Sequence, residues 1–279
     1  MKALFSKSVV AGAVALTAMF ASVSASAAPY NQFTVNPSAL DDPISDPYPT
    51  FSANKITGDY IERITFNGDG TFDVSLLWTA GQFVDRGGVG VIQDSGLGAR
   101  DGYGLYALYK ARGVVTAAGA VTKFSFTGPG SLEVFFDKNR NTANPTGVPA
   151  TGSGNFALTN TGDDLRLAYG EAVSGVGTLD TTLETCGDDG INCGSFGSTT
   201  TFNLTDFGKQ FFTAPNPFYN LSFQSGQLNN FVPEGTLTID GSLDVVFNEA
   251  ADVPEPASVG LLGLGLLGLG AARRRKQAK

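Results

Sequence analysis

Oxygen-bearing side chains recur at alternating positions in one short stretch of the chain. Asp137, Asn139 and Asn141 form the pattern Asp-x-Asn-x-Asn directly after an apolar run. Calcium loops present their oxygen ligands at such alternating positions, so these three residues are candidate calcium ligands. The stretch is not an EF-hand, because position six is Thr142 instead of glycine and position twelve is Val148 instead of glutamate.

A polar turn is the simpler interpretation of the same stretch, and it is the one we favour. Lys138 and Arg140 lie between the candidate ligands and would repel a cation. Asp69 and the pair Asp163–Asp164 complete a cation site only if the fold brings them close. We therefore expect the protein to need no cofactor, and we keep calcium as an optional ligand of this stretch.

Aromatic side chains are the second group that could bind a ligand. The chain has 21 Phe, 8 Tyr and 1 Trp. Exposed tyrosine and tryptophan rings stack on the apolar faces of sugar rings. The candidate glycan-binding residues are Tyr103, Tyr106, Tyr109 and Tyr219. Trp78 continues the alternating apolar face of Phe72, Val74 and Leu76, so we expect it in the core.

The sequence contains no histidine, which excludes several classes of catalysis. Ser-His-Asp and Cys-His mechanisms are impossible, and so is a His-ligated zinc site. Carboxylate-only chemistry, as in glycosidases, is still compatible with the composition. No carboxylate pair lies in a context that requires a raised pKa, so we predict no catalytic residues and no enzymatic activity. A secreted glycosidase is the remote alternative.

The two cysteines, Cys186 and Cys193, are separated by six residues. A disulfide is the expected state of such a pair in an exported chain. A redox-active pair is the alternative, but the spacing is not that of a C-x-x-C motif.

Alternating apolar and polar residues predict strands through most of the chain. The clearest case is a hairpin, in which two alternating runs, 60–66 and 72–79, flank Asn67-Gly68-Asp69-Gly70. Further strands are expected at 103–110, 124–126, 132–136, 156–158, 164–169, 202–204, 219–223 and 237–247, the last with a bulge or turn at Asp240-Gly241. Such strands separated by Gly-rich turns predict an all-β fold. The expected architecture is a single antiparallel β-sandwich of jelly-roll type.

One helix is plausible within this domain. Thr205 could cap a helix from Asp206 to Phe212, with Phe207 and Phe211 on one face. The Gly- and Thr-rich stretch 146–162 is expected to be a loop.

The N-terminal 27 residues have the three parts of a secretory signal. Lys2 and Lys7 supply positive charge, 8–20 is mostly apolar and small, and Ala25-Ser26-Ala27 is a cleavage site. The stretch is too short and too weakly apolar for a permanent membrane helix. We therefore expect a signal helix over 1–27 that the export translocon and signal peptidase process, which leaves a mature domain over 28–252.

The C-terminal 27 residues, 253–279, also have three parts. Pro254-Glu255-Pro256 is followed by an uncharged Leu/Gly-rich run, 257–272, and then by the basic cluster Arg273, Arg274, Arg275 and Lys276. A helix over that run would span roughly 24 Å, short of the ~30 Å hydrocarbon core of a bilayer. The basic cluster should stay cytoplasmic, so the rest of the chain should face outward.

Charge also limits the possible partners of the mature domain. Of 18 basic and 26 acidic residues, the two terminal segments hold seven and one, which leaves a formal charge of −14. Such a surface repels nucleic acid and anionic membranes. It would also repel an acidic polysaccharide unless a divalent cation bridged the two.

The tail resembles the PEP-CTERM sorting signal of Gram-negative bacteria. That resemblance implies an exosortase, a membrane protease that removes the tail after export; a permanent C-terminal anchor is the alternative. Within the domain, several stretches resemble the flocculation-associated PEP-CTERM family. They are residues 51–62, 77–83, 103–107, 211–219, 225–231 and 241–247.

The family resemblance implies an exported, non-enzymatic protein that makes cells aggregate with their exopolysaccharide into flocs. Its expected partners are the exosortase and either exopolysaccharide or components of neighbouring cell surfaces. Its expected location is the inner membrane transiently, then the cell surface or the extracellular matrix. The alternative function is that of a carbohydrate-binding module, with calcium as an optional requirement.

Overall fold

The computed structural model describes residues 30–40, 48–85, 87–186, 190 and 192–248. The predicted signal helix, 1–27, and the sorting tail, 253–279, lie outside the described residues. Within the described part, strands account for nearly all regular structure, which confirms the prediction of an all-β chain. None of the helices described there has the length and apolar character needed to cross a membrane.

The helical segments are the 3-10 helix η1 (Pro37–Ala39) and the α-helix α1 (Asp206–Phe211). The strands are β1 (Phe33–Val35), β2 (Phe51–Ala53), β3 (Lys55–Phe66), β4 (Thr71–Asp85), β5 (Gly90–Val91), β6 (Gly104–Ala118), β7 (Val121–Phe126), β8 (Ser131–Asp137), β9 (Leu165–Gly170), β10 (Ala172–Asp180), β11 (Gly194–Thr200), β12 (Asn203–Leu204), β13 (Phe212–Ala214), β14 (Asn220–Ser225) and β15 (Thr236–Asn248).

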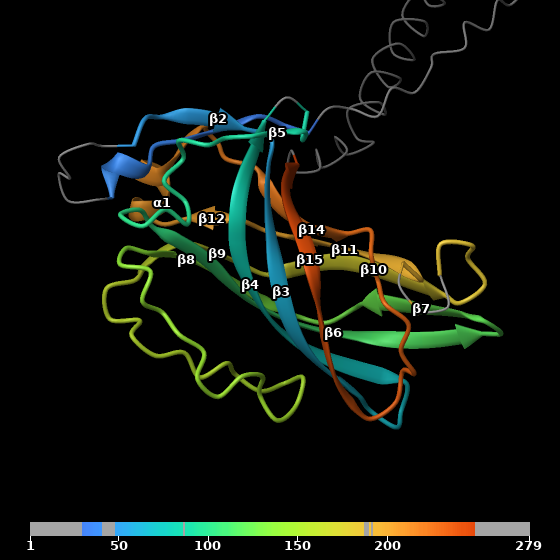
Figure 1. Cartoon of the computed structure of the whole chain (residues 1–279). Helices are drawn as coiled ribbons and strands as arrows, with labels where there is room; N and C mark the ends of the chain where they lie inside the picture. The colour runs from blue at the N-terminus through green and yellow to red at the C-terminus, as the bar shows by residue number, and fades with distance from the viewer. Residues whose placement is uncertain (1–29, 41–47, 86, 187–189, 191, 249–279) are drawn as a thin grey trace, which may run out of the picture.

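Eight strands form one antiparallel sheet that closes on itself (Figure 1). The order around the ring is β3, β4, β6, β7, β10, β11, β14 and β15. The ring closes where residues 236–246 of β15 pair with residues 55–65 of β3. The predicted β-sandwich is therefore wrong in architecture. Each strand pairs with its neighbour around the ring and β15 pairs with β3, so a single barrel replaces two facing sheets.

The long strand β6 explains the strands outside the ring. One edge of β6 pairs with β7 through residues 113–118 and with β8 through residues 104–110. The strands β9 and β12 then extend the wall beyond β8. A separate three-stranded sheet of β13, β1 and β2 lies at the same end. Its Phe33 ring packs on Phe247 of β15, with ring centres 4.7 Å apart.

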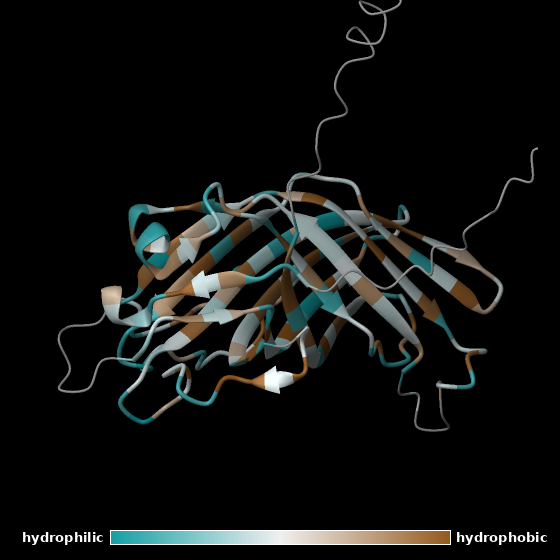
Figure 2. Cartoon of the chain, turned by 90° about the horizontal axis from the view of Figure 1, so that it is seen from above, coloured by the Kyte–Doolittle hydropathy of each residue, from teal (hydrophilic) through white to brown (hydrophobic). Residues whose placement is uncertain are grey.

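Alternating side chains fill the barrel, as the small diameter of an eight-stranded ring requires. Figure 2 shows hydrophobic and hydrophilic residues alternating along the strands. The predicted inward face of β4 is buried as expected, including Trp78, whose Nε1 donates a 3.0 Å hydrogen bond to the Leu243 carbonyl. The predicted hairpin turn forms as well. Asp69 accepts hydrogen bonds from the backbone amide and the hydroxyl of Thr71.

Two local predictions are wrong, and a third, the short helix, is confirmed with one residue fewer than expected. Residues 156–158 form no strand. The strand β15 runs through Asp240-Gly241 in unbroken register, because Gly241 leaves room for the Tyr60 ring opposite. In α1, which Thr205 caps as expected through the Gly208 amide, Phe211 is buried but Phe207 is 45% exposed. The helix is too short to bury both rings.

The segment 138–164 between β8 and β9 lies along the outside of the barrel. It contains no strand, as expected for 146–162. Its contacts with the barrel include the Arg63 Nε donating to the Pro149 carbonyl at 2.7 Å and the Lys110 Nζ donating to the Ser153 carbonyl at 3.1 Å. Both ends of this segment return to the end of the barrel where the acidic residues meet.

Candidate functional site

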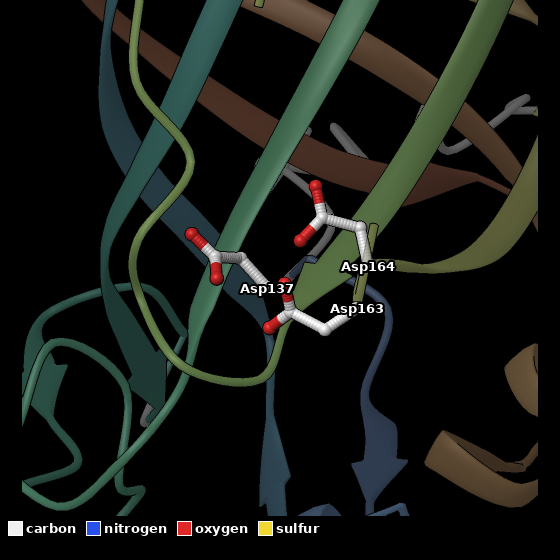
Figure 3. Close-up of side chains that lie close together, drawn as sticks. All are labelled: Asp137, Asp163 and Asp164. Carbon is white, nitrogen blue, oxygen red and sulfur yellow. The ribbon is translucent and has the colours of Figure 1, made fainter. Parts of the chain in front are cut away.

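Three carboxylates meet where β8 ends and β9 begins. Asp137 is the last residue of β8, and Asp163 and Asp164 immediately precede β9. The two strands are antiparallel and pair Phe136 with Leu165, which brings the next residue of β8 opposite the residue before β9. One carboxylate oxygen from each aspartate lies within 4.8 Å of the others (Figure 3).

Hydrogen bonds fix the buried member of this acidic cluster. Asp137 is 6% exposed. Its two carboxylate oxygens accept from the backbone amides of Asn141 and Thr142, at 3.2 and 3.1 Å. The turn after β8 therefore folds over its own strand end. This matches the favoured sequence interpretation of Asp137 to Asn141 as a polar turn.

The other two carboxylates are half-buried. Asp164 Oδ2 accepts from the Tyr106 hydroxyl at 2.6 Å and from the Thr142 hydroxyl at 2.8 Å. Asp164 Oδ1 is buried and has no hydrogen-bond partner within the described structure. Asp163 Oδ2 accepts from the Asn139 side-chain amide at 2.7 Å. Asp164 Oδ1 is thus a buried oxygen of the cluster that has no donor.

The electrostatics of the cluster reflect this crowding. Burial raises the pKa of Asp164, and the nearby Asp137 and Asp163 raise it further, while the bonds from Tyr106 and Thr142 oppose the shift. Burial and the hydrogen bond to Asp164 raise the pKa of the Tyr106 hydroxyl. A bound cation would relieve the repulsion among the three carboxylates.

The predicted ligand set is only partly assembled. Asp137 is in the cluster, but the Asn139 amide nitrogen faces Asp163 and the Asn141 side chain is exposed. The optional partners Asp163 and Asp164 do join it. Asp69 does not, because it is held in the turn between β3 and β4. Carboxylate oxygens suit a hard cation such as calcium, so Asp137, Asp163 and Asp164 could hold one.

The predicted glycan-binding tyrosines do not offer exposed rings. Tyr103, Tyr106 and Tyr109 are 0%, 6% and 1% exposed, respectively. Tyr219 is half-buried against Phe218, and its hydroxyl donates to the Gln32 carbonyl at 3.3 Å. A sugar ring needs an open aromatic face, so the first three residues do not fit the predicted role. Tyr103 and Tyr109 pack in the core, and Tyr106 stacks on Phe135 and bonds to Asp164.

An exposed aromatic residue that the sequence analysis did not select is Tyr169. It is 48% exposed, and the Arg166 guanidinium lies 5.5 Å from its ring centre. A bulge in β9 changes the register between Val134 and Phe135 of the partner strand. The bulge puts Tyr169 on the outer face with Arg166, although strict alternation would place them on opposite faces.

A half-buried carboxyl group lies at the inner wall of the barrel, where a charged side chain is not expected. Glu62 of β3 borders a cavity of about 30 Å³ with aromatic walls, which is room for about two water molecules. We find no hydrogen bond or ion pair to its carboxyl group within the described part of the chain. Burial raises the pKa of Glu62 to about 8. Alternation places Glu62 on the same face as the buried Tyr60 and Ile64, but its charge alone would predict that it faces solvent.

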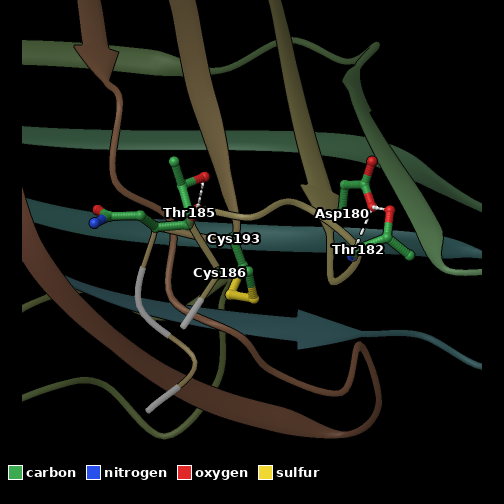
Figure 4. The surroundings of a disulfide bond; sticks show 6 residues. Asp180, Thr182, Thr185, Cys186 and Cys193 are labelled. Atoms are coloured by element: carbon green, nitrogen blue, oxygen red, sulfur yellow. Dashed lines mark hydrogen bonds between the residues drawn. A yellow bond between two sulfur atoms is a disulfide. The ribbon is translucent and has the colours of Figure 1, made fainter. Parts of the chain in front are cut away.

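The two cysteines form a disulfide in the structure (Figure 4). The Thr185 hydroxyl donates to the Asn192 carbonyl at 3.0 Å beside it, and Asp180 accepts from Thr182 nearby. The Cys193 amide donates to the Leu228 carbonyl at 2.7 Å. The disulfide loop is thereby tied to the segment between β14 and β15.

Comparison with known proteins identifies the tail alone. Residues 252–276 match the model of the PEP-CTERM protein-sorting motif, and no domain match supports the resemblance to the flocculation-associated family. No curated protein and no solved structure matches the chain. The motif includes the predicted sorting residues Pro254, Glu255 and Pro256 and the basic residues 273–276. It implies an exported cell-surface protein that an exosortase sorts, and the barrel is its exported domain.

Proposed function

We propose that this protein promotes cell aggregation at the surface of the cell that exports it. After signal peptidase and exosortase have removed 1–27 and the tail, the mature domain engages exopolysaccharide or neighbouring cells and holds flocs together. The observation that carries the proposal is the sorting motif at 252–276, which commits an acidic, disulfide-containing barrel to the cell exterior.

The architecture supports a role in binding or in assembly. The barrel interior is filled by side chains, so the outer wall and the loops provide the surface for partners. The resemblance of six stretches of the domain to the flocculation-associated family supports the more specific role. We propose a transient inner-membrane stage followed by release to the surface or the matrix.

We propose no enzymatic activity. Glycosidases separate their two carboxyl groups by ~5–5.5 Å or ~6.5–9.5 Å. One carboxylate oxygen from each residue of the acidic cluster lies within 4.8 Å of the other two, and both oxygens of Asp137 accept from backbone amides. This arrangement favours holding a cation over cleaving a glycosidic bond.

Calcium-dependent carbohydrate binding is the second candidate function. The observation that favours it is the acidic cluster, where a buried Asp164 oxygen has no donor. A cation held there would present a positive site on a domain with a formal charge of −14, and it could bridge to an anionic polymer.

Deletion and complementation test the main proposal. Cells lacking the protein should lose flocs and shed exopolysaccharide into the medium, and the intact chain should restore both. A chain with Pro254, Glu255 and Pro256 all replaced by Ala should be exported but should not restore flocs. If deletion leaves flocculation and matrix retention unchanged, the proposal is wrong. Calcium and chelator arms of the same assay test the second candidate.

A further inference from the structure

A groove of about 540 Å³ lies beside the exposed Tyr169, on the outside of the barrel. It is bordered by β9, β12, α1 and the chain that leads from β13 to β14 (Figure 1). Its lining includes Tyr169, Asn203, Lys209, Thr213, Asn216 and Phe218. Its volume falls within the ~300–1,000 Å³ typical of ligand sites.

The floor of the groove is a packed aromatic cluster. Phe202 and Phe212 are buried, and the Phe218 ring lies 5.8 and 5.1 Å from their ring centres. These contacts join β12, β13 and the start of β14. A ligand would therefore meet a preorganised surface, which lowers the ordering cost of binding.

The walls carry groups that suit a sugar chain. Tyr169 and Asn203 are cross-strand partners, and both are exposed. Asn216 and Thr213 are exposed on the opposite side. Within the described structure the Asn203 and Asn216 amides make no hydrogen bond, so both can bond to sugar hydroxyls. A half-exposed tyrosine flanked by side-chain amides is suited to a pyranose ring, which has an apolar face and a hydroxyl rim.

The charge of the groove contrasts with that of the domain. Among the described residues that line it, Lys209 alone is charged. Two carboxylates lie nearby, but Glu133 pairs with Arg166 at 2.8 Å and Asp206 lies 3.4 Å from Lys209. These two ion pairs leave the groove close to neutral on a domain that is strongly acidic, so it is a place where an anionic polymer meets little repulsion and needs no bridging cation.

We propose that this groove binds a segment of carboxylate-bearing polysaccharide. Tyr169 stacks on one sugar ring, the Asn203 and Asn216 amides bond its neighbours, and Lys209 pairs with a carboxylate of the polymer. The inference rests on the proposed function, because it names the site through which the exported barrel holds exopolysaccharide.

The chain's own C-terminal segment is the competing occupant. The last described residue, Asn248, pairs with Asn220, and Phe247 contacts Phe218 at 5.1 Å between ring centres. The chain therefore continues from a point beside the groove. The polysaccharide is preferred, because the groove offers side-chain amides and a lysine in addition to apolar surface.

The test is binding of the processed protein, purified from the cells that produce it, to their own exopolysaccharide, followed by co-sedimentation across a concentration series in chelator. Tyr169→Ala should weaken binding about tenfold, equivalent to about 1.4 kcal/mol. The double variant Asn203→Ala with Asn216→Ala should weaken it similarly. Lys209→Ala should weaken binding about threefold at low salt and should have no effect on polymer whose carboxylates have been reduced to alcohols.

Tyr30→Ala is the matched control, because Tyr30 is 38% exposed and also has a cation near its ring, Lys55 at 5.8 Å. It should leave binding unchanged, and thermal melting should show that all variants fold.

Equal binding by the wild type and every groove variant would overturn the inference while leaving the proposed function intact. So would a wild type that restores flocs but binds no polymer. Saturation of the groove by a peptide of residues 249–256, lost in Tyr169→Ala, would assign the groove to the chain itself. Failure of the intact chain to restore flocs would instead remove the proposed function.

Discussion

The Tyr106 hydroxyl donates a 2.6 Å hydrogen bond to Asp164, which joins the middle of the barrel wall to the start of β9. Tyr106 also stacks on Phe135 of β8, with ring centres 5.0 Å apart. One side chain thus connects three neighbouring strands next to the acidic cluster. The long segment 138–164 closes between Asp137 and Asp164, so this bond helps to define where the segment ends.

Tyr106→Phe should lower the free energy of unfolding by about 1.5–3 kcal/mol, because it removes a hydrogen bond to a charged group and leaves the Asp164 carboxylate less satisfied. Thermal melting should show a decrease of roughly 2–4 °C for each kcal/mol. Tyr219→Phe is the control, since its hydroxyl makes a longer 3.3 Å bond to a backbone carbonyl. Equal effects of the two substitutions would contradict the special role of Tyr106.

Calcium should raise the melting temperature of the processed protein if the acidic cluster holds it. At a free concentration 100-fold above Kd, the expected stabilisation is about 2.7 kcal/mol. Asp163→Asn should stabilise the protein in chelator, because it removes repulsion with Asp137 and Asp164. The same substitution should abolish the rise in melting temperature that calcium produces.

Asp69→Asn is the control for the calcium prediction. Asp69 lies in the β3–β4 turn with Thr71, so the substitution should change the starting stability but leave the calcium increment intact. A melting temperature that does not respond to calcium in the wild type would remove the cation role of the cluster. The stabilising effect of Asp163→Asn in chelator would still report the repulsion.

The sequence was sufficient for the local hairpins. Asn67-Gly68-Asp69-Gly70 between two alternating runs correctly predicted β3, β4 and their turn. The sequence was not sufficient to predict that the barrel closes. The closing strands β15 and β3 are far apart in the sequence, and no local pattern specifies that they pair. A sandwich and a barrel share the same alternation, so periodicity alone does not separate them.

Glycine explains why β10 was missed. Gly175 and Gly177 occupy inward positions of β10 where alternation would show apolar side chains. A Cβ atom at Gly175 would lie 2.3 Å from the Phe126 ring, so the missing side chain makes room for a neighbour's ring. The core position is filled from β7, and the sequence of β10 carries no sign of it.

The sequence indicated the residues of the acidic cluster but not that they would meet. Asp137 and the pair Asp163–Asp164 stood out as oxygen ligands, but their meeting depends on the register of β8 against β9, which contains a bulge. That same bulge moves Tyr169 to the outer face. The tyrosines of β6 are covered for reasons that no local pattern shows. Tyr103 and Tyr109 face the core, while Tyr106 stacks on Phe135 and bonds to Asp164.

The disulfide should stabilise the domain modestly. Replacing Cys186 and Cys193 together with Ser should lower the free energy of unfolding by about 2–3 kcal/mol, because the loop it closes is short. Urea titration should show a lower midpoint, and reduction of the wild type should reproduce it. Because the Cys193 amide bonds to Leu228, hydrogen exchange should also rise in the segment between β14 and β15. An unchanged midpoint would mean that neighbouring contacts alone hold this loop.

The stability of the barrel should depend on Glu62 over an unusual range of pH. The carboxyl group lies among Tyr60, Tyr109 and apolar walls, and burial raises its pKa from 4.5 to about 8. In the unfolded chain it ionises near its ordinary value, so the folded state loses stability as pH rises from about 4.5 to about 8, and its contribution is most favourable below that window. Glu62 keeps part of its surface open to the cavity, so the expected loss is about 2–4 kcal/mol, less than the full shift implies.

Glu62→Gln should remove this loss and make the variant more stable than the wild type at pH 9, with little difference at pH 4. Glu133→Gln, on the outer wall, should not change the profile, and a wild-type stability that is flat across pH 5–8 would contradict a neutral Glu62.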